Sequence, residues 1–207
     1  ALTQAPVATD TCTASPTRHL VSDQTTANPN CPNAYVRVRT WNFDDGCNNT
    51  SADFVQTITV VDTTAPGIST TAGTLDVTLQ CDDAVGLAAA LTQAPVATDT
   101  CTASPTRHLV SDQTTANPNC PNPYVRVRTW NFDDGCNNTS ANFVQTITVV
   151  DTTAPAISTT AGTLDVTLQC DDAAGLAAAL AQAPVATDTC TANPTRHLVS
   201  DQTTANP

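Results

Sequence analysis

The sequence predicts an all-β chain made of tandem β-sandwich modules with a period of 89 residues. Residues 1–6 recur at 90–95 and, with one change, at 179–184. Each copy carries short runs of alternating apolar and polar residues rich in β-branched side chains, which are typical of strands. Nine cysteines also recur, four per period with one extra. A unit of this length is too long for a helical solenoid or a leucine-rich repeat and fits a small domain that folds on its own.

The repeat itself is nearly exact. Residues 90–178 differ from residues 1–89 at only four positions, and residues 179–207 begin a third copy. The ends of the sequence therefore need not coincide with domain edges, and the lack of a starting Met and of a signal peptide suggests an internal or processed piece of a longer secreted chain.

Four segments of the first copy predict strands, taken here in chain order. They are residues 17–21, which give the weakest pattern, then 35–41, 54–61 and 75–80. Clusters of Asn, Pro, Asp and Gly at 27–30 and 44–46 predict turns between them. Residues 85–91 are the one segment that favours a helix, of at most two turns. Short antiparallel strands at this spacing predict a β-sandwich.

Alternation along the second of these strands places four large side chains on one face. They are Tyr35, Arg37, Arg39 and Trp41, and this face allows Arg–Trp stacking. We interpret the stripe as packing within the module, with Val36 and Val38 on the core side.

Composition and charge exclude several classes of function. Lys and Glu are absent, the net charge is −12, and the pI is near 4.1, which argues against nucleic acid or an anionic membrane surface as a partner. No apolar run approaches the ~20 residues of a membrane-spanning helix. His19, His108 and His197 are one position repeated, with no nucleophile at motif spacing, so we expect no enzyme.

The cysteines predict disulfides. An even number per repeat, without metal-ligand spacing, favours disulfides in an extracellular, oxidising compartment over a zinc site. Four cysteines permit three pairings, and spacing does not choose among them. Cys101–Cys120 would span a turn-containing segment between two strands, which leaves Cys81 for Cys136.

A series of motifs covers the whole period. In the second copy it reads TDTC at 98–101, CP at 120–121, YVRVRTW at 124–130, DGCNNT at 134–139 and QTITVVDTTAP at 145–155. This series resembles the hyalin-repeat-like (HYR-like) immunoglobulin-type modules of long bacterial surface adhesins, especially those of Bacteroidetes. The resemblance implies an Ig-like sandwich at 62–150, preceded by the C-terminal part of one module at 1–61 and followed by the N-terminal part of the next at 151–207.

The resemblance also implies a disulfide pairing within each module. It pairs Cys101 with Cys120, Cys81 with Cys136 and Cys12 with Cys31, and it leaves Cys47, Cys170 and Cys190 without partners. The rival pairing Cys47–Cys81 would cross a domain boundary.

The expected function is mechanical. Residues 60–66 join one module to the next without a Gly/Ser-rich linker, and Pro66 restrains the joint, so we expect a stiff, elongated rod. This predicts a structural segment of a secreted or cell-surface fibre or adhesin stalk, whose partners are neighbouring modules and other copies of the fibre. The alternative is a multivalent module that binds carbohydrate or a surface; ice binding and catalysis rank lower.

The sequence contains candidate glycosylation sites and paired acidic residues. Candidate glycosylation sites are the overlapping sequons at Asn48, Asn49, Asn137 and Asn138, and the Asp-Thr-Thr segments at Thr63 and Thr152. We expect covalent glycans on this chain. Paired Asp residues at 44–45, 82–83 and 133–134 raise the question of Ca²⁺, but none has the spacing of a known loop. Exposed turn residues are the preferred interpretation, and no metal site or cofactor is expected.

Overall fold

The computed structural model describes residues 4–120 and 122–204. Most of its regular structure is β-strand, with two short helices. The chain divides into two compact units, one containing residues 4–71, 95–110 and 129–143, and the other containing residues 72–94, 111–120, 122–128 and 144–204. The expected all-β class is therefore confirmed at the level of secondary structure.

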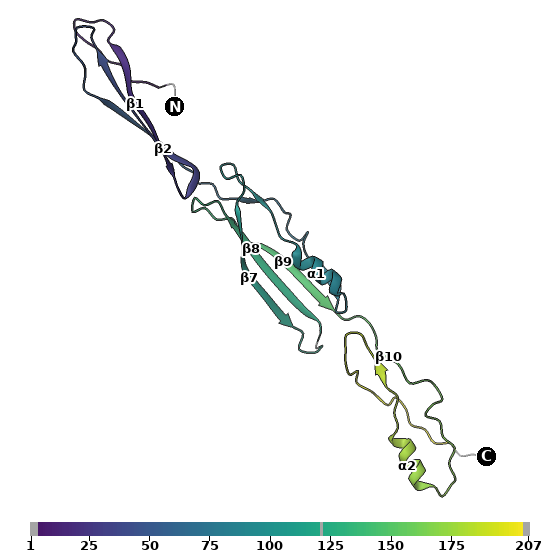
Figure 1. Cartoon of the computed structure of the whole chain (residues 1–207). Coiled ribbons are helices and arrows are strands. Elements are labelled where there is room, and N and C mark those ends of the chain that lie inside the picture. Colours follow the sequence, from purple (N-terminus) through teal and green to yellow (C-terminus); the bar gives the residue numbers. More distant parts are fainter. Residues whose placement is uncertain (1–3, 121, 205–207) are drawn as a thin grey trace. The chain divides into compact units, whose positions relative to one another are not determined.

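The first sheet is antiparallel and belongs to the first unit (Figure 1). It comprises β1 (Thr17–Asn28), β2 (Cys31–Asp44) and β3 (Phe54–Val60) in the order β1-β2-β3. The weak strand expected at 17–21 extends to Asn28, because the Thr-rich continuation pairs with β2. The turn predicted at 27–30 is therefore confined to residues 29–30.

The second sheet has the order β5-β9-β8-β7. Its strands are β5 (Val77–Gln80), β7 (Thr106–Ala116), β8 (Tyr124–Asp133) and β9 (Phe143–Val150), and β7 to β9 are the residues equivalent to β1 to β3. β5 pairs with β9 in parallel, whereas the sequence favoured antiparallel strands throughout. The reason is that α1 carries the chain back along the sheet, so that β5 and β7 run in the same direction.

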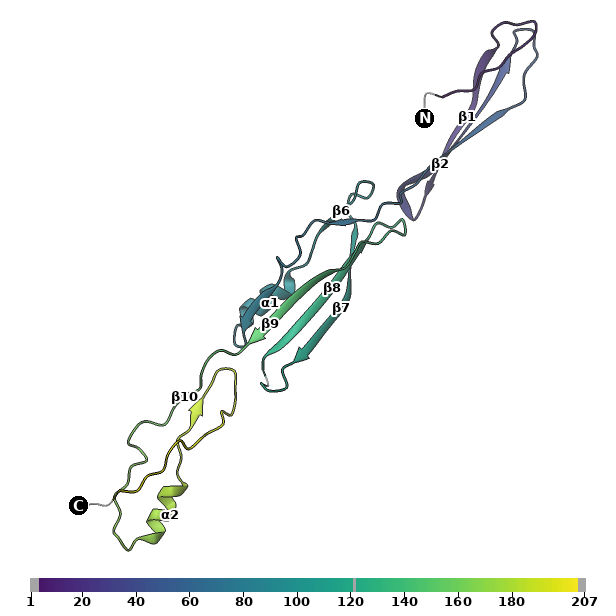
Figure 2. The ribbon, with the colours of Figure 1, turned by 180° about the vertical axis from the view of Figure 1, so that it is seen from behind.

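Helix α1 (Ala84–Thr92) covers part of this sheet, as both views show beside β9 (Figures 1 and 2). The side chain of Asp83 caps it by accepting a hydrogen bond from the backbone N–H of Gly86. Ala90 of the helix and Ile147 and Val149 of β9 form the buried core. Around it pack partly buried side chains, among them Val77, Leu79, Leu87, Leu91 and Tyr124. The expected helix at 85–91 is confirmed.

In the middle strands β2 and β8, the face that carries Tyr, Arg and Trp packs into the core. The sequence had been interpreted with the Val face on the core side. Trp130 is 2% exposed and packs 6.3 Å from Phe143, whereas Val125 is 37% exposed. The physical reason lies in Arg128, whose guanidinium donates hydrogen bonds to the carbonyls of Leu91 and Gln93. These bonds hold the face of β8 that carries Arg128 and Trp130 against the core. In the first copy the expected stacking is present, with Arg39 Cζ 4.3 Å from the Trp41 ring.

Short elements complete the described chain. β4 (Gly67–Ile68) pairs with β6 (Ala97–Thr98), and β10 (Ala156–Ile157) pairs with β11 (Ala186–Thr187). Helix α2 (Ala173–Ala181) repeats α1. Residues 166–169 and 195–204, equivalent to β5 and most of β7, are not assigned to strands. Within the part of the chain that is described, neither helix is long and apolar enough to cross a membrane.

Candidate functional site: the disulfide junctions

Two disulfides join residues that are more than one repeat apart. Cys31 is bonded to Cys136 and Cys81 to Cys190, with Cα–Cα distances of 4.6 and 5.8 Å and sequence separations of 105 and 109 residues. Each bond therefore links two of the ranges expected to be consecutive modules. The remaining cysteines are free thiols: Cys12, Cys47, Cys101, Cys120 and Cys170.

The predicted pairings within a module are wrong. Cys31, Cys81 and Cys136 are bonded, but to other partners than expected, and Cys12, Cys101 and Cys120 are free. The rival bond Cys47–Cys81 is not formed either.

Strand length explains the error. Cys101 precedes and Cys120 follows β7, whose 11 residues advance the chain by about 35 Å. A disulfide requires Cα atoms within about 7 Å. The 12-residue β1 separates Cys12 from Cys31 in the same way, so these two expected pairs lie at opposite ends of a strand.

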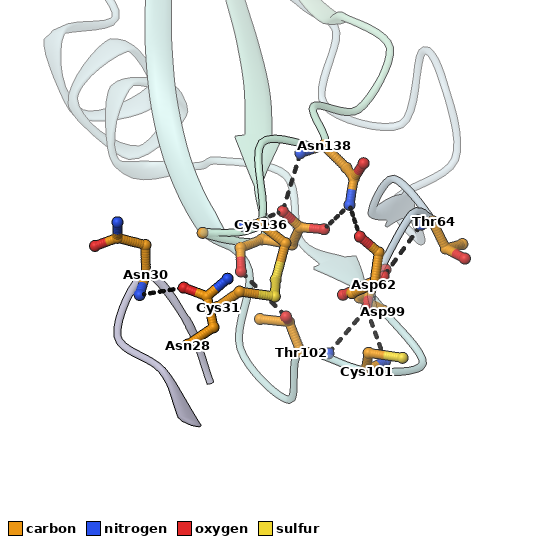
Figure 3. The surroundings of a disulfide bond; sticks show 12 residues. Asn28, Asn30, Cys31, Asp62, Thr64, Asp99, Cys101, Thr102, Cys136 and Asn138 are labelled. Carbon is orange, nitrogen blue, oxygen red and sulfur yellow. Dashed lines mark hydrogen bonds between the residues drawn. A yellow bond between two sulfur atoms is a disulfide. The ribbon is translucent and has the colours of Figure 1, made fainter. Parts of the chain in front are cut away.

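On one side of the Cys31–Cys136 junction is the loop that follows β8 (Figure 3). The carboxylate of Asp134 accepts hydrogen bonds from the backbone N–H groups of Cys136, at 2.7 Å, and Asn138, at 3.1 Å. Gly135 has a φ of +75°, and a Cβ there would lie 3.2 Å from the carbonyl oxygen of Asn30. Glycine therefore permits both the turn and the close approach of the other repeat.

On the other side is the turn between β1 and β2. The side chain of Asn28 accepts a hydrogen bond from the backbone N–H of Asn30 at 3.0 Å (Figure 3). Cys31 is the next residue of the chain after this turn. Cys31 is buried. Two preformed turns thus present the two sulfur atoms to each other.

Polar groups surround this junction (Figure 3). Asn138 Nδ2 donates to Asp134 Oδ2 at 2.6 Å and to the carbonyl of Asp62 at 3.1 Å, and the Thr102 hydroxyl donates to the carbonyl of Asp134 at 3.1 Å. Burial opposes ionisation of Asp134, but hydrogen bonds from the Asn138 side chain and from the N–H groups of Cys136 and Asn138 outweigh it and lower its pKa. The carboxylate therefore stays charged and fixes the loop.

The carboxylates near this junction form a poor set of metal ligands. Asp62 groups with Asp99 and Cys101, and also with Asp134 and Cys136, but the sulfur of Cys136 is in a disulfide. Each group offers two carboxylates, whereas Ca²⁺ takes six to eight oxygen ligands. The paired Asp residues noted in the sequence accept backbone hydrogen bonds instead, in turns and at the start of α1.

The Cys81–Cys190 junction is built in the same manner. Cys81 follows β5, and its N–H donates to the carbonyl of Val150 at 2.9 Å. The carboxylate of Asp188 accepts from the N–H groups of Cys190 and Thr191, at 2.8 and 2.6 Å. The repeated Thr-Asp-Thr-Cys motif is therefore an Asx turn that presents a cysteine.

The free cysteines of the same motifs sit in the same turns. Asp10 accepts from the N–H of Cys12 at 2.7 Å and Asp99 from that of Cys101 at 2.8 Å. In the other motif Asp45 accepts from the N–H of Cys47 at 2.7 Å. These thiols are held in the backbone geometry of their bonded equivalents. The Asp two residues before each of these cysteines is the sequence signal for such a turn. It does not indicate which cysteine the turn pairs with.

The candidate glycosylation sites fall into two groups. Asn48 and Asn137 are exposed, with φ of 70°, at the tips of their loops. The amide nitrogens of Asn49 and Asn138 donate to Asp45 and Asp134, which ties them to the loop. Thr63 and Thr152 are exposed, and the hydroxyl oxygen of Thr152 accepts a hydrogen bond from the side chain of Gln80.

The repeated histidine lies at the surface. His108 Nε2 is 2.5 Å from Asp133 Oδ2, and the side chain of His108 is half exposed. His19 and Asp44 form the equivalent pair in the first copy.

Comparison with known proteins adds no further constraint on the function. No family model, no curated protein and no solved structure matches this chain.

Proposed function

We propose that the chain is a structural repeat segment of a long secreted or cell-surface fibre or adhesin stalk, with no catalytic role. Its modules are Ig-like, of the HYR-like type, and the complete one spans residues 62–150. The observation that carries the proposal is that both disulfides connect ranges proposed as consecutive modules, 1–61 with 62–150 and 62–150 with 151–207, rather than closing one module on itself.

A bond of this kind suits an array of modules that is under tension. Cross-linking residues 105 positions apart removes about 4.7 kcal/mol of chain entropy from the unfolded state. It also gives each boundary between repeats a covalent connection in addition to the main chain. The boundary is then the place where tension and thermal opening are resisted.

The setting of such a fibre is extracellular. Disulfides persist in oxidising compartments. Exposed Asn48 and Asn137 offer sites for glycans that would keep a chain with so few aromatic residues hydrated and protected from proteases. Among the sequon residues these two are favoured, because the side-chain amides of Asn49 and Asn138 are hydrogen-bonded within the loop.

The proposal is tested by lengthening the array. Each added 89-residue copy brings four cysteines, and the bonding pattern predicts two further disulfides, which join two of the new cysteines to Cys120 and Cys170. The number of free thiols should therefore stay at five. Small-angle X-ray scattering of the same series should show the longest dimension rising by a constant increment per copy. Four more free thiols per copy, or a dimension that levels off, would contradict the proposal.

A further inference from the structure

We propose that the free edges of β1 and β7 are lateral docking sites for a second copy of this chain, whose identical edge strands pair with them in the antiparallel sense. This rests on the proposed fibre and adds to it the surface through which neighbouring chains meet. β1 is the first strand of the sheet β1-β2-β3, and β7 is the last strand of the sheet β5-β9-β8-β7. In both views β7 is the outermost strand of its sheet, on the side away from α1 (Figures 1 and 2).

The exposure of this edge is the same in two different surroundings. Leu20 and Val21 of β1 are 50% and 53% exposed, and the equivalent Leu109 and Val110 of β7 are 51% and 52% exposed. The sheet of β7 also contains β5 and packs against α1, whereas the sheet of β1 contains neither element. The free edge is therefore a property of the repeat itself and does not depend on which neighbouring segments are present.

The backbone of this edge is suited to strand pairing. An edge strand presents a row of N–H and C=O groups that have no partner in their own sheet. The register between β1 and β2 shifts between Leu20 and Ser22, which indicates a bulge, and then continues regularly to Ala27. The bulge interrupts only one part of the edge, and it leaves residues 22–27 of β1 and the equivalent residues 111–116 of β7 in regular strands.

The regular part of each edge carries a single ionisable side chain, which is paired within its own sheet. The carboxylate of Asp112 accepts hydrogen bonds from Nε and Nη2 of Arg126 at 2.6 and 2.8 Å. Asp23 makes the equivalent pair with Arg37, with both contacts at 2.6 Å. Although the net charge of the chain is −12, two copies can therefore meet at this edge without burying an unpaired carboxylate.

The side chains of the edge also match those of an identical strand. An antiparallel pair centred on Gln113 places Thr115 opposite Ser111 of the second copy, and Thr114 opposite Asp112 of the second copy. No two carboxylates are opposite each other in this register. Threonine is favoured in strands, and hydrogen bonds between Thr and Ser side chains stabilise pairs of strands. The edge is thus complementary to itself.

Each single contact of this kind is weak, but the repeat multiplies it. One pair of short edge segments buries less surface than the about 1,200 Å² at which stable interfaces begin. Every 89-residue copy carries the same edge, and linking such contacts raises the overall affinity by about 10²–10⁴-fold. We therefore expect reversible association of this chain at high concentration, and tighter association of longer arrays.

Sedimentation velocity of the full chain tests this, with both disulfides intact and the free thiols alkylated so that no further cross-links form. We expect monomer at low micromolar concentration and reversible self-association that increases toward millimolar concentration. Hydrogen exchange at the two ends of this range should show protection gained in residues 22–27 and 111–116 and unchanged in β9. A chain that is monomeric over the whole range, or that gains protection elsewhere instead, overturns edge pairing.

Two pairs of threonine-to-lysine substitutions make the matched control. Thr26→Lys with Thr115→Lys places a charged side chain on each edge, a device that blocks edge pairing in natural proteins, and should weaken association about tenfold or more. Thr40→Lys with Thr129→Lys makes the same change of charge on the middle strands β2 and β8 and should leave association unchanged. Unchanged protection of β9 in both variants shows that they fold. An equal loss of association in the second variant would mean that the faces of the sheets meet, and it would overturn edge pairing.

The outcomes separate this inference from the proposed function. A monomeric chain that keeps the Cys31–Cys136 and Cys81–Cys190 bonds overturns edge pairing and leaves the fibre proposal standing. Loss of those two bonds would overturn the fibre proposal, whether or not the chains associate.

Discussion

Phe143 and Phe54 occupy the same position of the repeat in two different environments. Phe143 is 4% exposed and packs against Trp130, whereas Phe54 is 50% exposed and lies at the same 6.3 Å ring distance from Trp41. Removal of a buried Phe side chain costs about 3–5 kcal/mol. For Phe54 about half of the apolar surface is already in water, so the cost should be about half as large.

The assay is hydrogen exchange followed by mass spectrometry, which reports the opening free energy of each sheet separately. Phe143→Ala and Phe54→Ala are compared at dilute concentration with both disulfides intact. We expect the larger loss of protection in β8 and β9 for Phe143→Ala, and a smaller loss in β2 and β3 for Phe54→Ala. Equal losses would contradict this expectation, because they would mean that the first sheet is covered as fully as the second.

Three further predictions concern polar groups. Gln145→Leu removes hydrogen bonds to two backbone carbonyls and should destabilise its sheet by about 2–3 kcal/mol in urea denaturation, while Gln56→Leu should be nearly neutral. Asp83→Ala removes the cap of α1 and should cost about 1 kcal/mol, seen as faster amide exchange in the first turn of that helix. A side-chain hydrogen bond from Arg126 lowers the pKa of Asp112, so this pair contributes stability above the carboxyl's ordinary pKa of 3.8 that is lost as the pH falls below it. Asp112→Asn should therefore reduce the fall of the unfolding midpoint with decreasing pH below about pH 4. The same fall in the variant as in the original chain would show that the Asp112–Arg126 pair does not contribute this stability.

Local patterns in the sequence were sufficient for most of the individual elements. Alternation and β-branched residues located β2, β3 and β5, and the Ala-rich segment after Asp83 located α1. The core face of β8 was misjudged, because a Val at an alternating position normally points inward. Here Arg128 donates a hydrogen bond to the carbonyl of Leu91, which is 37 residues away in the sequence. A local sequence pattern carries no information about a contact over that separation.

The junctions could be predicted only in part. The Asp that precedes Cys136 and Cys190 by two residues indicates that each cysteine sits in a turn. Choosing the partner requires knowing which end of a strand each cysteine occupies. The strand that begins at Thr17 was expected to stop at residue 21 but runs to Asn28, so that Cys31 lies far from Cys12. Strand length, more than spacing in sequence, decided the pairing.

The most direct test of the account is a disulfide map of the monomeric chain, alkylated before digestion so that thiols cannot exchange. Cleavage after arginine releases Cys31 and Cys136 on different peptides. We predict one product of three peptides, 19–37, 40–107 and 129–196, because Cys136 and Cys190 lie on the same peptide. Tandem mass spectrometry of this product should assign the bonds Cys31–Cys136 and Cys81–Cys190, with the other five cysteines alkylated. Bonds within a repeat, Cys12–Cys31, Cys81–Cys136 and Cys101–Cys120, would contradict it.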